Sequence, residues 1–88
     1  MNVFPIPFVA NQNFQTGFIS FTNLPVNGKI VIYDLLGEPV FKTTNVNPVY
    51  RWNVKNNAGR DVQSGLYLYV IRDGKNKKVK SGKLIIVR

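Results

Sequence analysis

Residues 50–88 read YRWNVKNNAGRDVQSGLYLYVIRDGKNKKVKSGKLIIVR, and this stretch decides the fold. Two apolar runs, SGLYLYVI and KLIIV, are separated by a lysine-rich polar segment that begins with Asp73 and Gly74. An Asp-Gly pair between two β-rich runs is a strong hairpin signal, because glycine adopts the positive φ that tight turns require. The sequence therefore predicts a long β-hairpin. Tyr50 and Trp52 form a further strand, and turn-forming residues between positions 56 and 65 lead from it into the hairpin.

Upstream of this stretch the chain alternates between short strands and turns, and no segment has a helical period. The predicted strands cover residues 2–9, 17–23, 30–33, 39–43, 50–52, 66–72 and 77–87. Pro5 and Pro7 remove two backbone donors, which restricts the first segment to the edge of a sheet. Seven short antiparallel strands with turn signals between them predict an all-β fold, a two-sheet sandwich of the immunoglobulin or fibronectin type III kind.

The phase of the apolar residues predicts the core. Along residues 66–72 the tyrosines share one face with Ile71 and the leucines share the other. We expect the tyrosine face to point inward, because Arg72 continues the leucine phase into solvent. The predicted core, with Trp52 at its centre, consists of Ile19, Phe21, Ile30, Ile32, Tyr50, Trp52, Tyr67, Tyr69, Ile71, Leu84 and Ile86.

The outer face of the hairpin is then unusually apolar. This face either contacts a preceding domain or carries the scattered hydrophobic residues that most surfaces have. In the last strand Val79 is out of phase with Leu84 and Ile86, which predicts a β-bulge at Ser81 and Gly82.

Three groups of motifs resemble the immunoglobulin-like C-terminal modules of large bacterial secreted proteins. VFPIPFV at residues 3–9 is similar to their opening motif, although Ile6 stands where asparagine is usual, so the turn loses a side-chain cap. GKIVIYDLLGEPV at residues 28–40 is similar to their central strand, tight turn and return strand. Trp52, the NAGR turn, SGLYLYVI and the closing GKLIIVR follow in the same order. Two related groups share this pattern: the sorting domains of the type IX (Por) secretion system and the immunoglobulin-like domain named after the flagellar hook-capping protein.

The resemblance implies a role in sorting, with the secretion machinery as partner and the closing hairpin as the signal. A terminal hairpin offers an edge that strand addition or charge can recognise. The candidate recognition residues are Gly65, Tyr67, Lys78, Lys80, Lys83 and Arg88. The alternative is a structural spacer or interaction module that packs on an adjacent domain of the parent chain, including an assembly domain of the hook-capping type.

The length of 88 residues fits one domain, residues 1–88, with one core. With 44% hydrophobic residues the chain is globular, and the absence of cysteine excludes a disulfide framework. The sequence has neither a signal-peptide pattern nor a transmembrane segment. We therefore expect the C-terminal module of a longer protein whose signal peptide, if it is exported, lies elsewhere in that protein. The resemblance places that protein outside the cell or on its surface, reached through the periplasm.

The residue inventory argues against catalysis. The chain has no histidine and no cysteine, so the commonest general base and metal ligand and the thiol nucleophile are missing. The four carboxylates fall in or beside predicted turns, where they cap backbone amides; they are Asp34, Glu38, Asp61 and Asp73. A calcium site that uses Asn56, Asn57 and Asp61 has the right oxygen ligands, but its spacing matches no calcium loop. We expect neither an enzyme nor a cofactor.

The net charge of +8 leaves three interpretations open. The lysines of the last hairpin can be a solvated face that protects a sheet edge from aggregation. They can attract an anionic glycan at a cell surface, in a salt-dependent way. Nucleic-acid binding is disfavoured, because the aromatic residues that would stack on bases are better used in the core.

Overall fold

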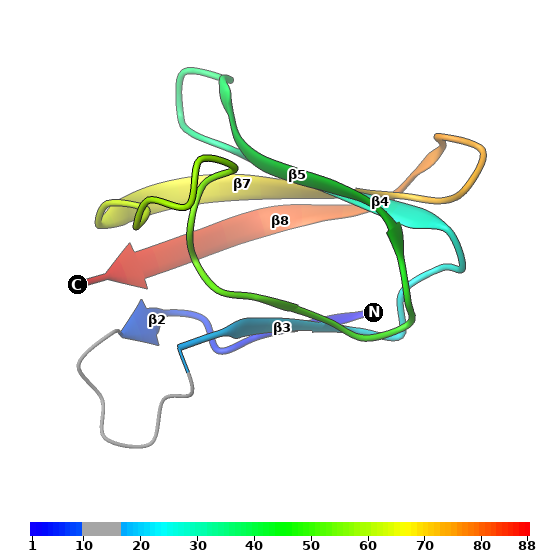
Figure 1. Ribbon diagram of the computed structural model, residues 1–88, viewed down its shortest axis with the longest axis horizontal. Helices are drawn as coiled ribbons and strands as arrows, with labels where there is room; N and C mark the ends of the chain where they lie inside the picture. The colour runs from blue at the N-terminus through cyan, green and yellow to red at the C-terminus, as the bar shows by residue number, and fades with distance from the viewer. Residues whose placement is uncertain (10–16) are drawn as a thin grey trace.

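The strands of the protein form two facing sheets in a computed structural model that describes residues 1–9 and 17–88. The strands are β1 (Asn2–Phe4), β2 (Phe8–Val9), β3 (Ile19–Thr22), β4 (Gly28–Tyr33), β5 (Pro39–Val46), β6 (Tyr50–Trp52), β7 (Gly65–Arg72) and β8 (Lys78–Val87). One sheet has the order β1-β3-β6 and the other the order β2-β8-β7-β4-β5. Figure 1 shows the two sheets as separate layers, so the fold is an all-β sandwich.

The predicted edge strand over residues 2–9 is in fact two strands that belong to different sheets. β1 pairs antiparallel with β3, whereas β2 pairs parallel with β8, where Phe8 lies opposite Ile86. Pro5 and Pro7 lie between β1 and β2 and have no backbone N–H, so neither sheet ladder continues through them. The expectations of seven strands and of wholly antiparallel pairing were therefore wrong. The described residues form eight strands with one parallel pair.

The core lies between the two sheets. Tyr67, Tyr69 and Ile71 alternate along β7 with outward-facing residues and point into it, as predicted. Every predicted core residue is buried except Tyr50, which is half-buried at the margin. Trp52 is 1% exposed, and its ring centroid lies 5.6 Å from that of Phe41. Phe21 meets Tyr69 edge to face across the two sheets, with centroids 5.9 Å apart. Among the residues that the structure describes, five further ones are buried that were not predicted, namely Phe8, Leu24, Val46, Val54 and Val62.

β5 is longer than predicted. It extends to Val46, whose side chain is buried and which pairs with Gly28 at the start of β4. The predicted strand covers residues 39–43, and asparagine and proline around this valine are typical of the loop expected at residues 45–48. Burial of Val46 outweighs those turn signals.

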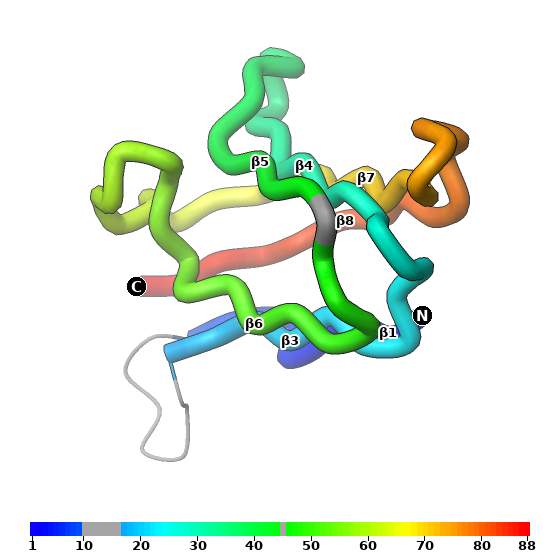
Figure 2. The backbone as a smooth tube through the Cα atoms, turned by 45° about the vertical axis from the view of Figure 1, so that its right-hand side comes forward, coloured from blue at the N-terminus to red at the C-terminus, as the bar shows by residue number. Residues whose placement is uncertain are grey.

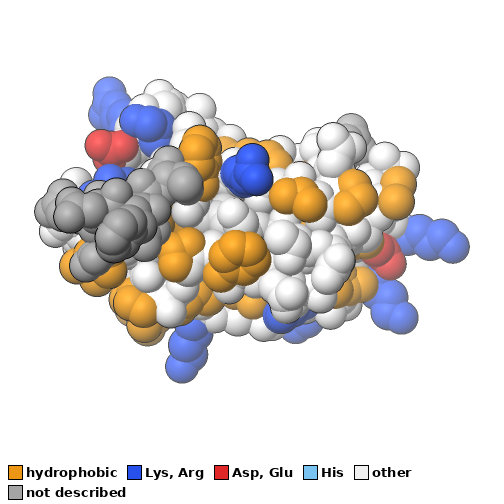
Figure 3. All heavy atoms as spheres, turned by 90° about the horizontal axis from the view of Figure 1, so that it is seen from below, with side chains coloured by type: hydrophobic (Ala, Val, Ile, Leu, Met, Phe, Trp, Pro, Cys, Tyr) orange, Lys and Arg blue, Asp and Glu red, His pale blue; other side chains and the backbone are white. Residues whose placement is uncertain are grey.

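The first and last residues lie at opposite ends of the long axis of the sandwich, and Figures 1 and 2 agree on this arrangement. Figure 3 shows the side of the three-stranded sheet, where apolar side chains lie among polar atoms. The acidic side chains visible on this side lie near the two ends of the molecule. The described part of the chain contains no helix with the length and hydropathy needed to cross a membrane.

Candidate functional site on the closing hairpin

The closing hairpin is built from β7 and β8, and β7 also pairs with β4, so the hairpin is anchored inside the five-stranded sheet. Gly65 is exposed at the start of β7 and pairs with Ile86. Further along, Tyr69 pairs with Gly82, and its ring lies directly over this glycine on the inner face. A Cβ atom on Gly82 would lie 2.6 Å from the Tyr69 hydroxyl oxygen, so only glycine fits beneath the ring.

The turn of the hairpin differs from the prediction in one residue. The backbone carbonyl of Asp73 accepts the N–H of Asn76 at 2.9 Å. The backbone N–H of Asp73 donates to the carbonyl of Lys77, also at 2.9 Å. The residue with positive φ is Asn76 (φ 67°), not Gly74. The expectation that Gly74 supplies the positive φ was therefore wrong, because the three-residue loop places its left-handed position last, at Asn76. Asparagine tolerates that conformation better than most residues.

The same turn occurs three times in the described chain, in the segments DLLGE (34–38), NNAGR (56–60) and DGKNK (73–77). In each one the first residue accepts two backbone N–H groups on its side-chain oxygen, from the third and fifth residues of the segment. The fourth residue has positive φ in all three turns; it is Gly37, Gly59 or Asn76. The side chains of Asp34 and Asp73 thus cap backbone amides, as the sequence suggested.

A β-bulge sets which hairpin lysines face outward. Ile71 pairs with Lys80 and Arg72 pairs with Lys78, so Val79 is the extra residue. The bulge therefore lies at Val79 and not at Ser81 and Gly82, where the pairing is regular. An extra residue reverses the inside-outside alternation, which turns Lys78 to the outer face of the sheet.

Of the three candidate lysines in β8, two are exposed and one forms a hydrogen bond with the backbone. Lys78 and Lys83 are exposed and line a hollow on the outer face. Lys80 is half-buried on the inner side, and its Nζ donates to the backbone carbonyl of Met1 at 2.6 Å. Lys80 thus links β8 to the start of the chain. The sequence treated all three lysines as one surface cluster, and the bulge explains why Lys80 does not belong to it.

Arg88 fastens the end of β8 to the segment that precedes the hairpin. Its backbone N–H donates to Ser64 Oγ at 2.8 Å, and its Nη2 donates to the carbonyl of Val54 at 2.8 Å. Its Nε donates to the carbonyl of Val62. The sequence offers no signal for these contacts, because backbone carbonyls are acceptors in every residue.

Asp61 forms a close ion pair with Lys55 and a longer one with Arg88. Its Oδ1 accepts a hydrogen bond from Lys55 Nζ at 3.0 Å and lies 3.9 Å from Arg88 Nη2. The hydrogen bond and charge of Lys55, and then the charge of Arg88, lower the pKa of Asp61. Both ion pairs are solvent-exposed, so they contribute little to stability.

Tyr67 has its ring in the core and its hydroxyl at the edge. The hydroxyl donates to the carbonyl of Gln63 at 2.8 Å. Burial, and then the negative charge of Asp34, raise the pKa of Tyr67 above its ordinary value of 10.0. The hydroxyl is therefore a neutral hydrogen-bond donor at physiological pH, and it fixes the turn into β7.

The three groups that the sequence offered for calcium already have partners. Asn56 Oδ1 accepts two backbone N–H groups, Asn57 Oδ1 accepts the N–H of Lys42 at 2.9 Å, and Asp61 pairs with Lys55. Asn57 also donates to the carbonyl of Lys42, so this loop is tied to β5. Asn56 thus caps a turn, whereas the expectation that Asp61 caps a backbone amide was wrong, because its carboxylate pairs with Lys55.

The sandwich and its basic closing hairpin define a small β-sandwich module that presents one charged sheet face. The chain belongs to the CHU_C type IX secretion signal domain family, whose model matches residues 9–86. Of the two groups that the motifs resemble, the match is to the type IX group.

A solved structure has the same fold. The chain is similar to PorZ of Porphyromonas gingivalis, described as an essential bacterial surface component of the type IX secretion system. The two share 24% sequence identity with a TM-score of 0.79, over 99% of this chain and 11% of PorZ. The chain thus spans a small part of PorZ. No curated protein matches the sequence.

Proposed function

We propose that this chain is the non-catalytic sorting module of a longer exported protein and that the β7–β8 hairpin carries the signal read by the type IX machinery. The observation that carries this proposal is the family match over residues 9–86, which includes nearly all of the hairpin. The module passes through the periplasm and ends outside the cell or on its surface.

The geometry of the hairpin supports this role. Lys78 and Lys83 are exposed on the outer face, whereas Tyr67 and Arg88 hold the hairpin in a fixed position and Gly65 begins its pairing at Ile86. A signal recognised as a folded shape requires this rigidity, because a mobile hairpin would lose conformational entropy on binding. Lys80 contributes indirectly, through its bond to the carbonyl of Met1.

The same observations support the finer assignments. The hydroxyl of Tyr67 bonds to a carbonyl four residues upstream, as in the tyrosine corner of immunoglobulin-like sandwiches, so we assign the fold to that type. The core is continuous across both sheets, which fits a single domain. Each carboxylate lies outside the strands in or beside a turn, and the chain has no histidine or cysteine, which fits a binding role rather than catalysis.

Transplantation tests the proposal. The chain is fused to a periplasmic reporter in a host that has type IX secretion, and reporter is measured in the periplasm, on the surface and in the medium. We expect the fusion to leave the periplasm and the reporter alone to stay there. A fusion that remains in the periplasm while folded would contradict the proposal.

Two variants separate folding from recognition. Deletion of residues 83–88 removes Leu84 and Ile86 from the core, so it abolishes export by unfolding the module. The double change Lys78→Gln and Lys83→Gln leaves the core intact and should reduce export with little effect on stability. Lys80 is kept in this variant, because its removal would break the contact with the start of the chain.

A further inference from the structure

Three cations lie side by side across the outer face of the five-stranded sheet. Lys29 on β4 lies directly opposite Arg72 on β7, and Arg72 lies directly opposite Lys78 on β8. Like charges that are directly opposite on neighbouring strands destabilise a sheet. The bulge at Val79 turns Lys78 to the outer face, and it is therefore responsible for the repulsion between Lys78 and Arg72. The fold thus maintains a row of repelling charges.

The next residues along these strands form an apolar floor beside the row. Val31 lies opposite Val70, and Tyr33 lies opposite Leu68, which is 38% exposed. A hollow of about 310 Å³ opens over β7 and β8. Its lining includes Tyr33, Leu68, Val70, Ser81, Lys78 and Lys83. Its floor is therefore apolar, and lysines stand at its rim.

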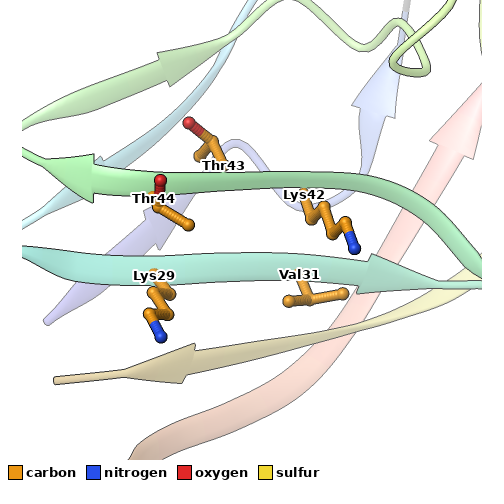
Figure 4. A pocket seen from close by; sticks show the side chains of 5 residues that line it. All are labelled: Lys29, Val31, Lys42, Thr43 and Thr44. Carbon is orange, nitrogen blue, oxygen red and sulfur yellow. The ribbon is translucent and has the colours of Figure 1, made fainter. Parts of the chain in front are cut away.

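A second hollow lies on the other side of Val31. It measures about 540 Å³ and is lined by Lys29, Val31, Lys42, Thr43 and Thr44. Figure 4 shows Lys42 extending from β5 toward β4, where Val31 lies, while Lys29 extends from β4 toward the neighbouring strand. Because Val31 pairs with Val70, the two hollows belong to one continuous surface.

No carboxylate balances these charges from within the strands. All four carboxylates of the chain lie between strands, and Asp34 and Asp73 accept backbone N–H groups in their turns. The surface therefore has apolar side chains surrounded by lysine and arginine, and the counter-charges must come from elsewhere.

We propose that the outer face of β4, β7 and β8 binds an acidic protein surface of the export machinery. Apolar side chains of the partner occupy the hollow over Val70, and its carboxylates pair with Lys29, Arg72 and Lys78. This inference rests on the proposed sorting function and adds to it the location of the contact and the chemistry of the partner.

A protein fits this surface better than other anions do. Protein interfaces combine an apolar centre with a charged rim, which is the arrangement seen here. Single-stranded nucleic acid is held by stacking on several aromatic rings, and on these strands Tyr33 is the one outward-facing aromatic ring of the described residues. A second copy of the chain is disfavoured, because it would place lysines against lysines.

The sharpest test compares two adjacent residues. Lys78→Glu and Lys77→Glu make the same charge change in the same hairpin, but only Lys78 belongs to the cationic row. Lys78→Glu replaces a repulsion with an attraction to Arg72, so it should raise the melting temperature by about 1–4 °C. The same change should lower export of the reporter fusion by at least about tenfold. Lys77→Glu should leave export within about twofold of the original.

A variant that is more stable and yet not exported excludes misfolding as the cause. If both variants are exported equally well while the intact fusion is exported, this inference is wrong and the sorting function stands. If the intact fusion is not exported, the sorting function itself is wrong. A lower melting temperature for Lys78→Glu would contradict the repulsion on which the argument depends.

A binding experiment tests the chemistry of the partner directly. The isotope-labelled chain is titrated with a short peptide that alternates glutamate with valine, with polyglutamate of equal charge, with oligothymidylate and with anionic phospholipid vesicles. We expect the alternating peptide to bind several-fold more tightly than the other three probes and to shift the amide signals of Val31, Val70 and Ser81. Equal binding of polyglutamate, or tighter binding of oligothymidylate or vesicles, would overturn the proposed partner.

Discussion

Replacement of Trp52 by alanine should remove a large part of the stability of this domain. The side chain is 1% exposed, its ring packs against Phe41, and its Nε1 donates to the carbonyl of Lys55 at 2.9 Å. Loss of a buried tryptophan costs about 3–5 kcal/mol, through the transfer of its atoms and the cavity that remains. A chain of 88 residues has a total stability of about 4–13 kcal/mol, so this loss is between about a quarter and all of that stability.

Chemical denaturation followed by far-ultraviolet circular dichroism measures this effect, since Trp52 is the sole tryptophan and its fluorescence disappears with it. Trp52→Phe is the matched control. It keeps most of the apolar volume and loses the hydrogen bond to Lys55, so it should cost about 1–3 kcal/mol. A Trp52→Ala variant that loses less than about 1 kcal/mol would refute the assignment of this ring to the centre of the core.

Three further predictions concern the hairpin. Gly82→Ala places a methyl group 2.6 Å from the Tyr69 hydroxyl oxygen and should lower the free energy of unfolding by about 1–3 kcal/mol. Tyr69→Leu in the same chain should recover part of that loss, whereas strict additivity of the two changes in a double-mutant cycle would argue against the contact. Asn76→Gly should raise the free energy of unfolding by about 0.5–1 kcal/mol, because glycine adopts the φ of 67° without strain; an unchanged denaturation midpoint would show that asparagine is already relaxed there. A hydrogen bond from the backbone N–H of Lys77 lowers the pKa of Asp73 in the folded state. This carboxylate therefore stabilises the fold above its unfolded pKa of about 3.9, and the stabilisation is lost as the pH falls through the folded pKa. Melting temperatures measured from pH 5 downward should fall less steeply for Asp73→Asn than for the original chain.

The sequence predicts the sandwich because its signals are local and repeated. Alternating apolar residues identify the inward face of β7. In two of the three turns, an Asp or Asn that lies three residues before a glycine marks the turn. The strand at Phe8 and Val9 could not be separated from β1, because two residues are too few for a periodic pattern. Asn76 was missed as the left-handed residue, since Gly74 is the stronger turn signal in the same segment.

The candidate site was predicted less completely than the fold. The sequence locates the lysines of the hairpin but not the bulge at Val79, and a shift of one residue decides which lysines face outward. The contacts of Arg88 with the carbonyls of Val54 and Val62 depend on tertiary structure alone. The row formed by Lys29, Arg72 and Lys78 likewise appears only once three strands are in register.

The parallel pair between β2 and β8 has a consequence for synthesis of the protein. Phe8 pairs with Ile86, so a segment synthesised early in the module has no strand partner until a segment synthesised late in the module has been made. Phe8, 2% exposed in the finished domain, has no sheet to join until Ile86 is made. A polypeptide cut short by premature termination or proteolysis before this point cannot assemble the hairpin against its neighbour. Display of the hairpin in its folded form therefore reports that translation of the whole module is complete.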